Sequence, residues 1–176
     1  MVKTQLDQKG FALAIVLLFV LAIGCATAVL VPRALRWQHA AVVQYETDCL
    51  ASDLRLMQQM MRTATVYPIE ETAEHRLSDT APEFELRDGE HAYIIWRHTY
   101  EGSLPMSSRL VRHDYPKALN ISTNTKRRIR FGSNGGTAST TTIYVFYTGE
   151  MERGKKIILD SVGRIRVEAM DENDTP

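Results

Sequence analysis

The sequence lacks the motifs by which most enzymes and metalloproteins are recognised. It contains no G-x-S-x-G nucleophile motif, no H-E-x-x-H zinc motif, no phosphate-binding glycine loop and no closely spaced pair of cysteines. The five histidines are scattered, at positions 39, 75, 91, 98 and 113, and the acidic cluster around His75 has no second histidine at ligand spacing. We therefore expect a protein that is not an enzyme and that has no catalytic residue, metal ion or cofactor.

The chain also has little cysteine and no net charge. Of its two cysteines, Cys25 lies in an apolar run, which leaves Cys49 without a partner for a disulfide. We expect Cys49 to be a small buried hydrophobic residue. The formal net charge of +0 at pH 7 excludes a global attraction to nucleic acid or to an acidic membrane surface.

The apolar run around Cys25 dominates what the sequence does contain. From Phe11 to Val31 there is no charged residue and only one hydroxyl, that of Thr27. As a helix, this run would be about 31 Å long, close to the hydrocarbon thickness of a bilayer. The run therefore predicts a single transmembrane helix over residues 11–31. The basic residues before it favour a cytoplasmic N-terminus and an extracytoplasmic remainder.

Three kinds of processing are compatible with this N-terminal region. Ala26-Thr27-Ala28 fits the small-residue site of a secretory signal peptidase. Gly24-Cys25 fits the end of a lipoprotein signal, although Ala22 stands where such signals usually carry leucine. Cleavage at the Gly10–Phe11 bond would instead leave the apolar helix in the mature protein.

The residues around the third possible cleavage site, the Gly10–Phe11 bond, resemble those of a known family. A short basic leader ending in Gly10, then Phe11 and about twenty apolar residues, resembles the class III signal of type IV pilins and pseudopilins. The resemblance implies that residues 1–10 are a leader, that a prepilin peptidase cuts after Gly10, and that the new amine of Phe11 is methylated. Gly24 and Pro32 fall where helices of this family loosen in assembled pili.

One position departs from the family pattern. Ile15 occupies the fifth mature position, where these proteins usually carry glutamate. A carboxylate inside lipid costs about 2.5–3.5 kcal/mol on insertion scales, and in pilins it pairs with the amine of a neighbouring subunit. Some minor pseudopilins at filament tips lack it. The substitution therefore favours a minor subunit over a major, polymer-forming one.

The segment after the apolar run predicts an amphipathic continuation of the helix over residues 32–66, ended by Pro68. Its apolar stripe contains Val42, Tyr45, Cys49, Leu50, Leu54, Met57, Met60, Met61 and Ala64. The polar residues assigned to the other faces are Glu46, Asp48, Asp53, Arg55 and Gln59. The stripe needs a partner, and the sheet that follows can cover it.

Residues 67–170 predict a β-rich head and residues 171–176 an acidic, frayed tail. We expect a solvated connection over Glu70–Glu83, a loop over Asn120–Thr125, and turns at Asp88-Gly89, Gly132–Gly136, Gly149–Gly154 and Ser161–Gly163. The predicted strands are Phe84–Leu86, His91–His98, Leu110–Val111, Lys126–Phe131, Thr140–Tyr147, Lys155–Leu159 and Arg164–Val167. The predicted class is α+β, a pilin-like fold in which a long N-terminal helix packs on an antiparallel β-sheet.

The C-terminal order of a basic-apolar strand, a glycine-rich turn, a β-branched strand and Gly163-Arg164-Ile165-Arg166-Val167 is similar to minor pseudopilins of the GspH/FimT type. The two resemblances imply a structural subunit at or near the tip of a type II secretion pseudopilus or a type IV or competence pilus. Its partners would be other pilin subunits, prepilin peptidase and the lipid of the inner or sole cell membrane, where it would reside as a single-pass protein.

Two alternatives stay open. The first is a tip subunit that captures DNA for uptake through a basic patch. Its candidate residues are Lys126, Arg127, Arg128, Arg130, Arg164 and Arg166. The same residues would also protect an exposed sheet edge from aggregation, with Glu150, Glu152 and Asp160 reducing any positive field. The second alternative is a signal-anchored exported domain unrelated to pili.

Overall fold

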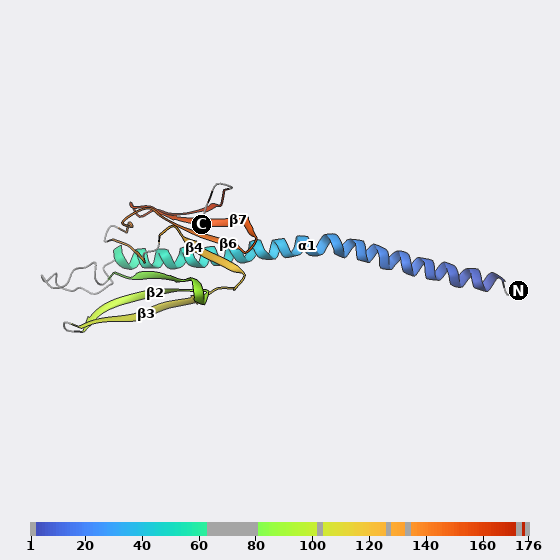
Figure 1. The fold of residues 1–176 in the computed structure, drawn as a ribbon, viewed down its shortest axis with the longest axis horizontal. Coiled ribbons are helices and arrows are strands. Elements are labelled where there is room, and N and C mark those ends of the chain that lie inside the picture. The colour runs from blue at the N-terminus through green and yellow to red at the C-terminus, as the bar shows by residue number, and fades with distance from the viewer. Residues whose placement is uncertain are drawn as a thin grey trace. The chain divides into compact units, whose positions relative to one another are not determined.

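The computed structural model describes residues 3–62, 81–101, 104–125, 128–132, 135–171 and 174, with the side chains of residues 3–10 and 99–105 excepted. The chain divides into two units, Met1–His39 and Ala40–Pro176, which we describe separately. Figure 1 follows the chain from the N-terminal helix to the C-terminal strands.

Helix α1, Lys3–Arg62, provides all the described structure of the first unit. Every side chain from residue 11 to residue 38 is exposed. By its length and composition, the helix is apolar enough to cross a membrane. In the isolated subunit the helix is continuous through Gly24 and Pro32. The hydroxyl of Thr27 donates to the carbonyl oxygens of Ile23 and Gly24. The loosening expected there in assembled pili stays a prediction.

The part of α1 in the second unit buries one apolar stripe. Leu50, Leu54 and Met57 are completely buried, and Met61 is nearly so, as the periodicity predicts. The assignment of Tyr45 to this stripe is wrong, because its side chain is 62% exposed. Cys49 is only half-buried, and Ala64 lies outside the described residues.

Two antiparallel sheets of four strands each complete this unit. Sheet A has the order β3-β2-β1-β5, and sheet B has the order β4-β6-β7-β8. The strands of sheet A are β1 (Glu83–Arg87), β2 (Ala92–Glu101), β3 (Leu104–Asp114) and β5 (Ile129–Arg130). The strands of sheet B are β4 (Leu119–Thr123), β6 (Thr141–Tyr147), β7 (Glu150–Leu159) and β8 (Ile165–Ala169).

Buried residues of α1 and of both sheets form one hydrophobic cluster. In the second unit, α1 lies between the two sheets (Figure 1). Phe84 and Ile95 of sheet A and Ile143 and Ile157 of sheet B all contribute to the cluster. The predicted α+β class, with a long helix packed on antiparallel strands, is confirmed, with two sheets in place of the single one expected.

Three local predictions are wrong. Residues 120–125 were expected to form a loop, yet β4 covers most of them, because Leu119 and Ile121 face the core while the polar side chains alternate with them. Strand β7 begins at Glu150, directly after a turn at Gly149, which has a φ of 83°. The third error is His91, which was expected to begin a strand but has a left-handed backbone.

Gly154 was assigned to the turn before the strand Lys155–Leu159, but it lies within β7. A Cβ atom at Gly154 would lie 2.4 Å from the sulfur of Met170. The glycine therefore permits close packing inside a strand and does not mark a turn. The predicted turn at Asp88-Gly89 is confirmed as the 3-10 turn η2, Asp88–Glu90.

Candidate functional site

The first candidate site is the exposed apolar surface of α1 in the first unit. Phe11 is 70% exposed, and among the described residues of this unit no other element covers the run that follows it. Full burial of one large apolar side chain is worth about 1.5–3 kcal/mol, so a surface of this size in water would be strongly unfavourable. Such a surface is favourable in lipid or against another apolar surface. Gly10 and Phe11 both lie within α1, and Ile15 is exposed.

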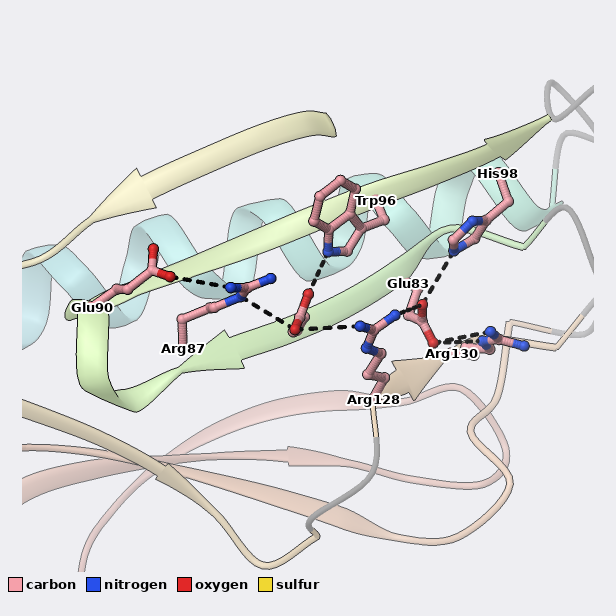
Figure 2. Close-up of polar contacts among 8 residues, drawn as sticks. Glu83, Arg87, Glu90, Trp96, His98, Arg128 and Arg130 are labelled. Atoms are coloured by element: carbon pink, nitrogen blue, oxygen red, sulfur yellow. Dashed lines mark hydrogen bonds and ion pairs between the residues drawn. The ribbon is translucent and has the colours of Figure 1, made fainter. Parts of the chain in front are cut away.

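The second candidate site is a group of ion pairs on the polar face of sheet A, centred on Glu83 (Figure 2). Glu83 was assigned to a solvated connection, but it begins β1 and is only 3% exposed. Its Oε2 atom accepts from Nη1 of Arg128 at 2.8 Å and lies 3.1 Å from Nε2 of His98. Its Oε1 atom accepts from Nε of Arg130 at 3.0 Å and forms an ion pair with Nη2 of the same side chain, also at 3.0 Å. The sequence showed the arginines but not their partner, because nothing local indicates that Glu83 is buried.

A second row of polar contacts continues along β1. Oε2 of Glu85 accepts from the indole N–H of Trp96 at 2.6 Å, and Oε1 of Glu85 lies 3.2 Å from Nε of Arg87. Arg87 also contacts Glu90 at 3.1 Å. The row reaches Arg128, whose Nη2 atom lies 3.4 Å from Glu85. Opposite charges therefore alternate along this face.

The ion pairs around Glu83 keep its carboxylate and the guanidinium of Arg128 charged. Burial by itself would raise the pKa of Glu83, but the hydrogen bonds from Arg128 and Arg130 outweigh it and hold that pKa below its usual value. The same contact with Glu83 raises the pKa of Arg128. Glu83 is therefore ionised, and much of the positive charge of the two arginines is compensated within the head.

The predicted basic patch is divided between the two sheets. Arg128 and Arg130 lie at sheet A with half-exposed side chains, both held by Glu83. Arg166 is on β8 of sheet B, 3.5 Å from both Asp160 and Glu168. Arg164 is exposed just before β8. Lys126 and Arg127 lie outside the described residues.

The third candidate feature is a hydrogen-bonded contact between α1 and two turns, one at Gly135 and one at Gly163. Gln58, only 8% exposed, donates from Nε2 to the carbonyl oxygen of Gly135 at 2.7 Å and to that of Gly163 at 2.6 Å. These turns approach so closely that a Cβ atom at Gly136 would lie 1.8 Å from the carbonyl oxygen of Ser161. The sequence indicates two turns, but their contact with each other and with one helix side chain is a property of the tertiary structure.

Polar residues of α1 also face sheet A, contrary to their assignment to other faces. The carboxylate of Glu46 is buried and lies 2.6 Å from Nε2 of His113. The hydroxyl of Tyr93 donates to Asp53 at 2.7 Å, and its ring stacks on that of His113 at 5.1 Å. These contacts connect the helix to β2 and β3 through polar groups.

The described residues of the acidic tail are held against β7. Nζ of Lys156 lies 3.0 Å from Asp171 and 2.9 Å from Asp174. Hydrogen bonds to Asp174 and Asp171 raise the pKa of Lys156. Within the described ranges, no three histidine, cysteine or acidic side chains gather closely enough to hold a metal ion.

No protein-family model and no curated protein matches this sequence. Among solved structures, the chain is similar to two crystal structures of the type IV minor pilin FimU of Pseudomonas aeruginosa. One superposes with a TM-score of 0.51 over 76% of this chain and 90% of the FimU chain, at 16% sequence identity. The other, at 20% identity, covers 69% of this chain and 91% of the FimU chain with a TM-score of 0.44. The chain thus has the fold of a minor pilin.

Proposed function

We propose that this protein is a minor pilin, a structural subunit anchored by α1 in the inner or sole cell membrane and drawn from there into a type IV pilus or a related pseudopilus. The observation that carries the proposal is the uncovered apolar surface of α1 from Phe11 onward, in a chain with a pilin-like fold. The head supplies contacts outside the membrane and does no chemistry.

The same helix surface serves both states. In the membrane, lipid tails cover the side chains of residues 11–31. In a filament, the corresponding helices of sister subunits replace the lipid, so little hydrophobic free energy changes and the fit between helices decides assembly. A polar substitution in this run therefore disfavours both states.

Ile15 supports a place at or near the filament tip. A glutamate at this depth would need a partner amine from a neighbouring subunit, because an unpaired carboxylate in lipid costs about 2.5–3.5 kcal/mol. Isoleucine neither carries that cost nor offers that pairing. A subunit with no neighbour above it loses nothing by the replacement.

Maturation provides the first test. The chain is produced in cells with and without an active prepilin peptidase, and the membrane-extracted protein is examined by intact mass and N-terminal sequencing. We expect a mature form that starts at N-methylated Phe11 only when the peptidase is present. Gly10→Val should block cleavage, whereas Gly24→Val should not, since no atom lies within 4 Å of a Cβ at Gly24. A mature form that begins at Val29 or at acylated Cys25 would overturn the proposal and favour an unrelated exported domain.

Position in the filament is tested by counting and locating labelled subunits. We expect very few copies per filament, at one end, and fewer incorporated copies on substitution Ile15→Glu, because that subunit has no neighbouring amine to pair with the new carboxylate. Labels distributed along the shaft would rule out the tip position while leaving the pilin assignment in place.

DNA capture is a second candidate function, favoured by one observation. Arg164 is exposed at the turn before β8 and has no ion-pair partner among the described residues. Arg128 and Arg130 favour it less, because Glu83 compensates their charge. If Arg164→Glu reduces DNA uptake while filaments still form, capture is a role of this subunit. Loss of filaments would support a purely structural role.

A further inference from the structure

A cavity of about 300 Å³ in the second unit has no role in the proposed function. It lies among the turn that joins β1 to β2, the residue that follows β3, and strands β4 and β6. Its lining includes Asp88, His91, Tyr115, Asn120, Ser122 and Phe146. These residues come from four separate stretches of the sequence, so no motif indicates the cavity.

The rings of His91 and Tyr115 form one wall of the cavity, and backbone contacts hold them in place. His91 has a left-handed conformation, with φ 49° and ψ 48°, and is the one non-glycine residue with positive φ in the described part of the chain. Its carbonyl oxygen accepts from the N–H of Tyr115 at 2.9 Å. The two rings meet edge to face, with centroids 5.8 Å apart. An unusual backbone conformation of this kind is maintained only where its surroundings require it.

The polar groups of the cavity give it a negative character. Asp88 has the one formal charge of the lining and no ion-pair partner among the described residues, since the neighbouring Arg87 is held by Glu85 and Glu90. Burial and then the charge of Asp88 raise the pKa of Tyr115 to about 12. Asn120 donates its amide hydrogen to Thr148 at 3.0 Å, which leaves its side-chain oxygen available as an acceptor.

We propose that this cavity binds an organic cation, an ammonium or guanidinium group on an aliphatic stem. The charged group of the ligand would pair with the carboxylate of Asp88 and lie against the ring of Tyr115. Aromatic rings attract cations electrostatically in this arrangement. The stem would pack on Phe146, as the side chains of lysine and arginine pack on apolar surfaces elsewhere. The unpaired carboxylate disfavours an anion.

The test is a titration of the full chain in detergent with N-acetyl-lysine methylamide, followed by NMR or calorimetry. We expect saturable binding, and binding up to about fivefold weaker by the Asp88→Asn variant, the fold-change that corresponds to the loss of one exposed ion pair. Asp88 is exposed, so this variant should fold normally. Glu152→Gln, at an exposed acid of β7 outside the cavity, is the matched control and should bind like wild type.

Two results would overturn the inference. The neutral analogue N-acetyl-norleucine methylamide could bind as tightly as the lysine compound, or Asp88→Asn could leave the affinity unchanged. Either result would mean that no charge is recognised. The inference does not rest on the proposed function and would survive its failure.

The cation has two possible sources, a small free amine or a basic side chain of a neighbouring chain. A photoreactive residue in place of Lys117, two residues after Tyr115, distinguishes them in intact cells. A cross-link to another chain that disappears in the Asp88→Asn background supports a protein side chain. Tight binding of cadaverine without such a cross-link supports a free amine.

Discussion

Gln58 offers the sharpest test of how the helix and the two glycine turns hold each other. Both hydrogens of its side-chain amide are used, on the carbonyl oxygens of Gly135 and Gly163 at 2.7 and 2.6 Å. Gln58→Met keeps the length and approximate volume of the side chain and removes both donors. The Gly135 carbonyl then has no donor from the helix, and the Gly163 carbonyl keeps only a long contact with Arg62, at 3.5 Å.

The expected loss follows from this geometry. Each buried hydrogen bond contributes about 0.5–1.5 kcal/mol net, and a carbonyl left unpaired adds to that, so we expect a loss of about 2–3 kcal/mol. For a head of this size the unfolding midpoint should fall by roughly 10 °C. The matched control is Gln44→Met on the same helix. Gln44 contacts Asp48 and Lys155 at the exposed surface, where such contacts contribute less than about 1 kcal/mol.

Urea unfolding of the full chain in detergent measures both effects. In a Trp37→Phe background, fluorescence reports on Trp96 of β2 alone, because these are the two tryptophans of the chain. Equal stability of Gln58→Met and wild type would refute the reasoning. So would an equal loss in Gln44→Met, because the effect would then not depend on burial.

Three further predictions concern the head. Gly136→Ala should lower the free energy of unfolding by more than about 3 kcal/mol or prevent folding, because the new Cβ atom would lie 1.8 Å from a backbone oxygen. The control is Gly89→Ala, which has open space around the new Cβ atom and should change the free energy of unfolding little in the same urea assay. The pKa of Glu83 is lower in the folded than in the unfolded chain. The ionised carboxylate therefore stabilises the folded chain fully above its ordinary pKa, and this stabilisation is lost as the pH falls through the pKa of the folded chain. Stability measured against pH should therefore fall less steeply in acid for Glu83→Gln than for wild type; parallel curves would contradict the ion-pair assignment. Arg164→Ala should leave thermal stability within about 0.5 kcal/mol of wild type, because this side chain is exposed, and a larger loss would show a packing role.

The sequence by itself was sufficient for the features that depend on local pattern. The absence of charge from Phe11 to Val31 predicts an apolar helix of membrane-spanning length, since a polar group in that run would be unfavourable in lipid. The three- and four-residue spacing of Leu50, Leu54, Met57 and Met61 predicts the buried stripe of the same helix. The β-branched stretch Thr140–Tyr147 similarly predicts a strand, which the structure shows as β6, Thr141–Tyr147.

Only the tertiary structure decided which polar residues are buried and what they contact. Glu83 and Glu46 appear as solvated acids in the sequence, but their partners, Arg128 and His113, are distant in the chain and are brought near by strand pairing and by the position of the helix. The division of the chain's β-strands between two sheets was equally hidden, because it depends on which strands pair and not on the pattern within any one of them. A local pattern determines whether a segment is a helix or a strand, whereas the pairing of a buried charge depends on contacts between segments, which no single segment encodes.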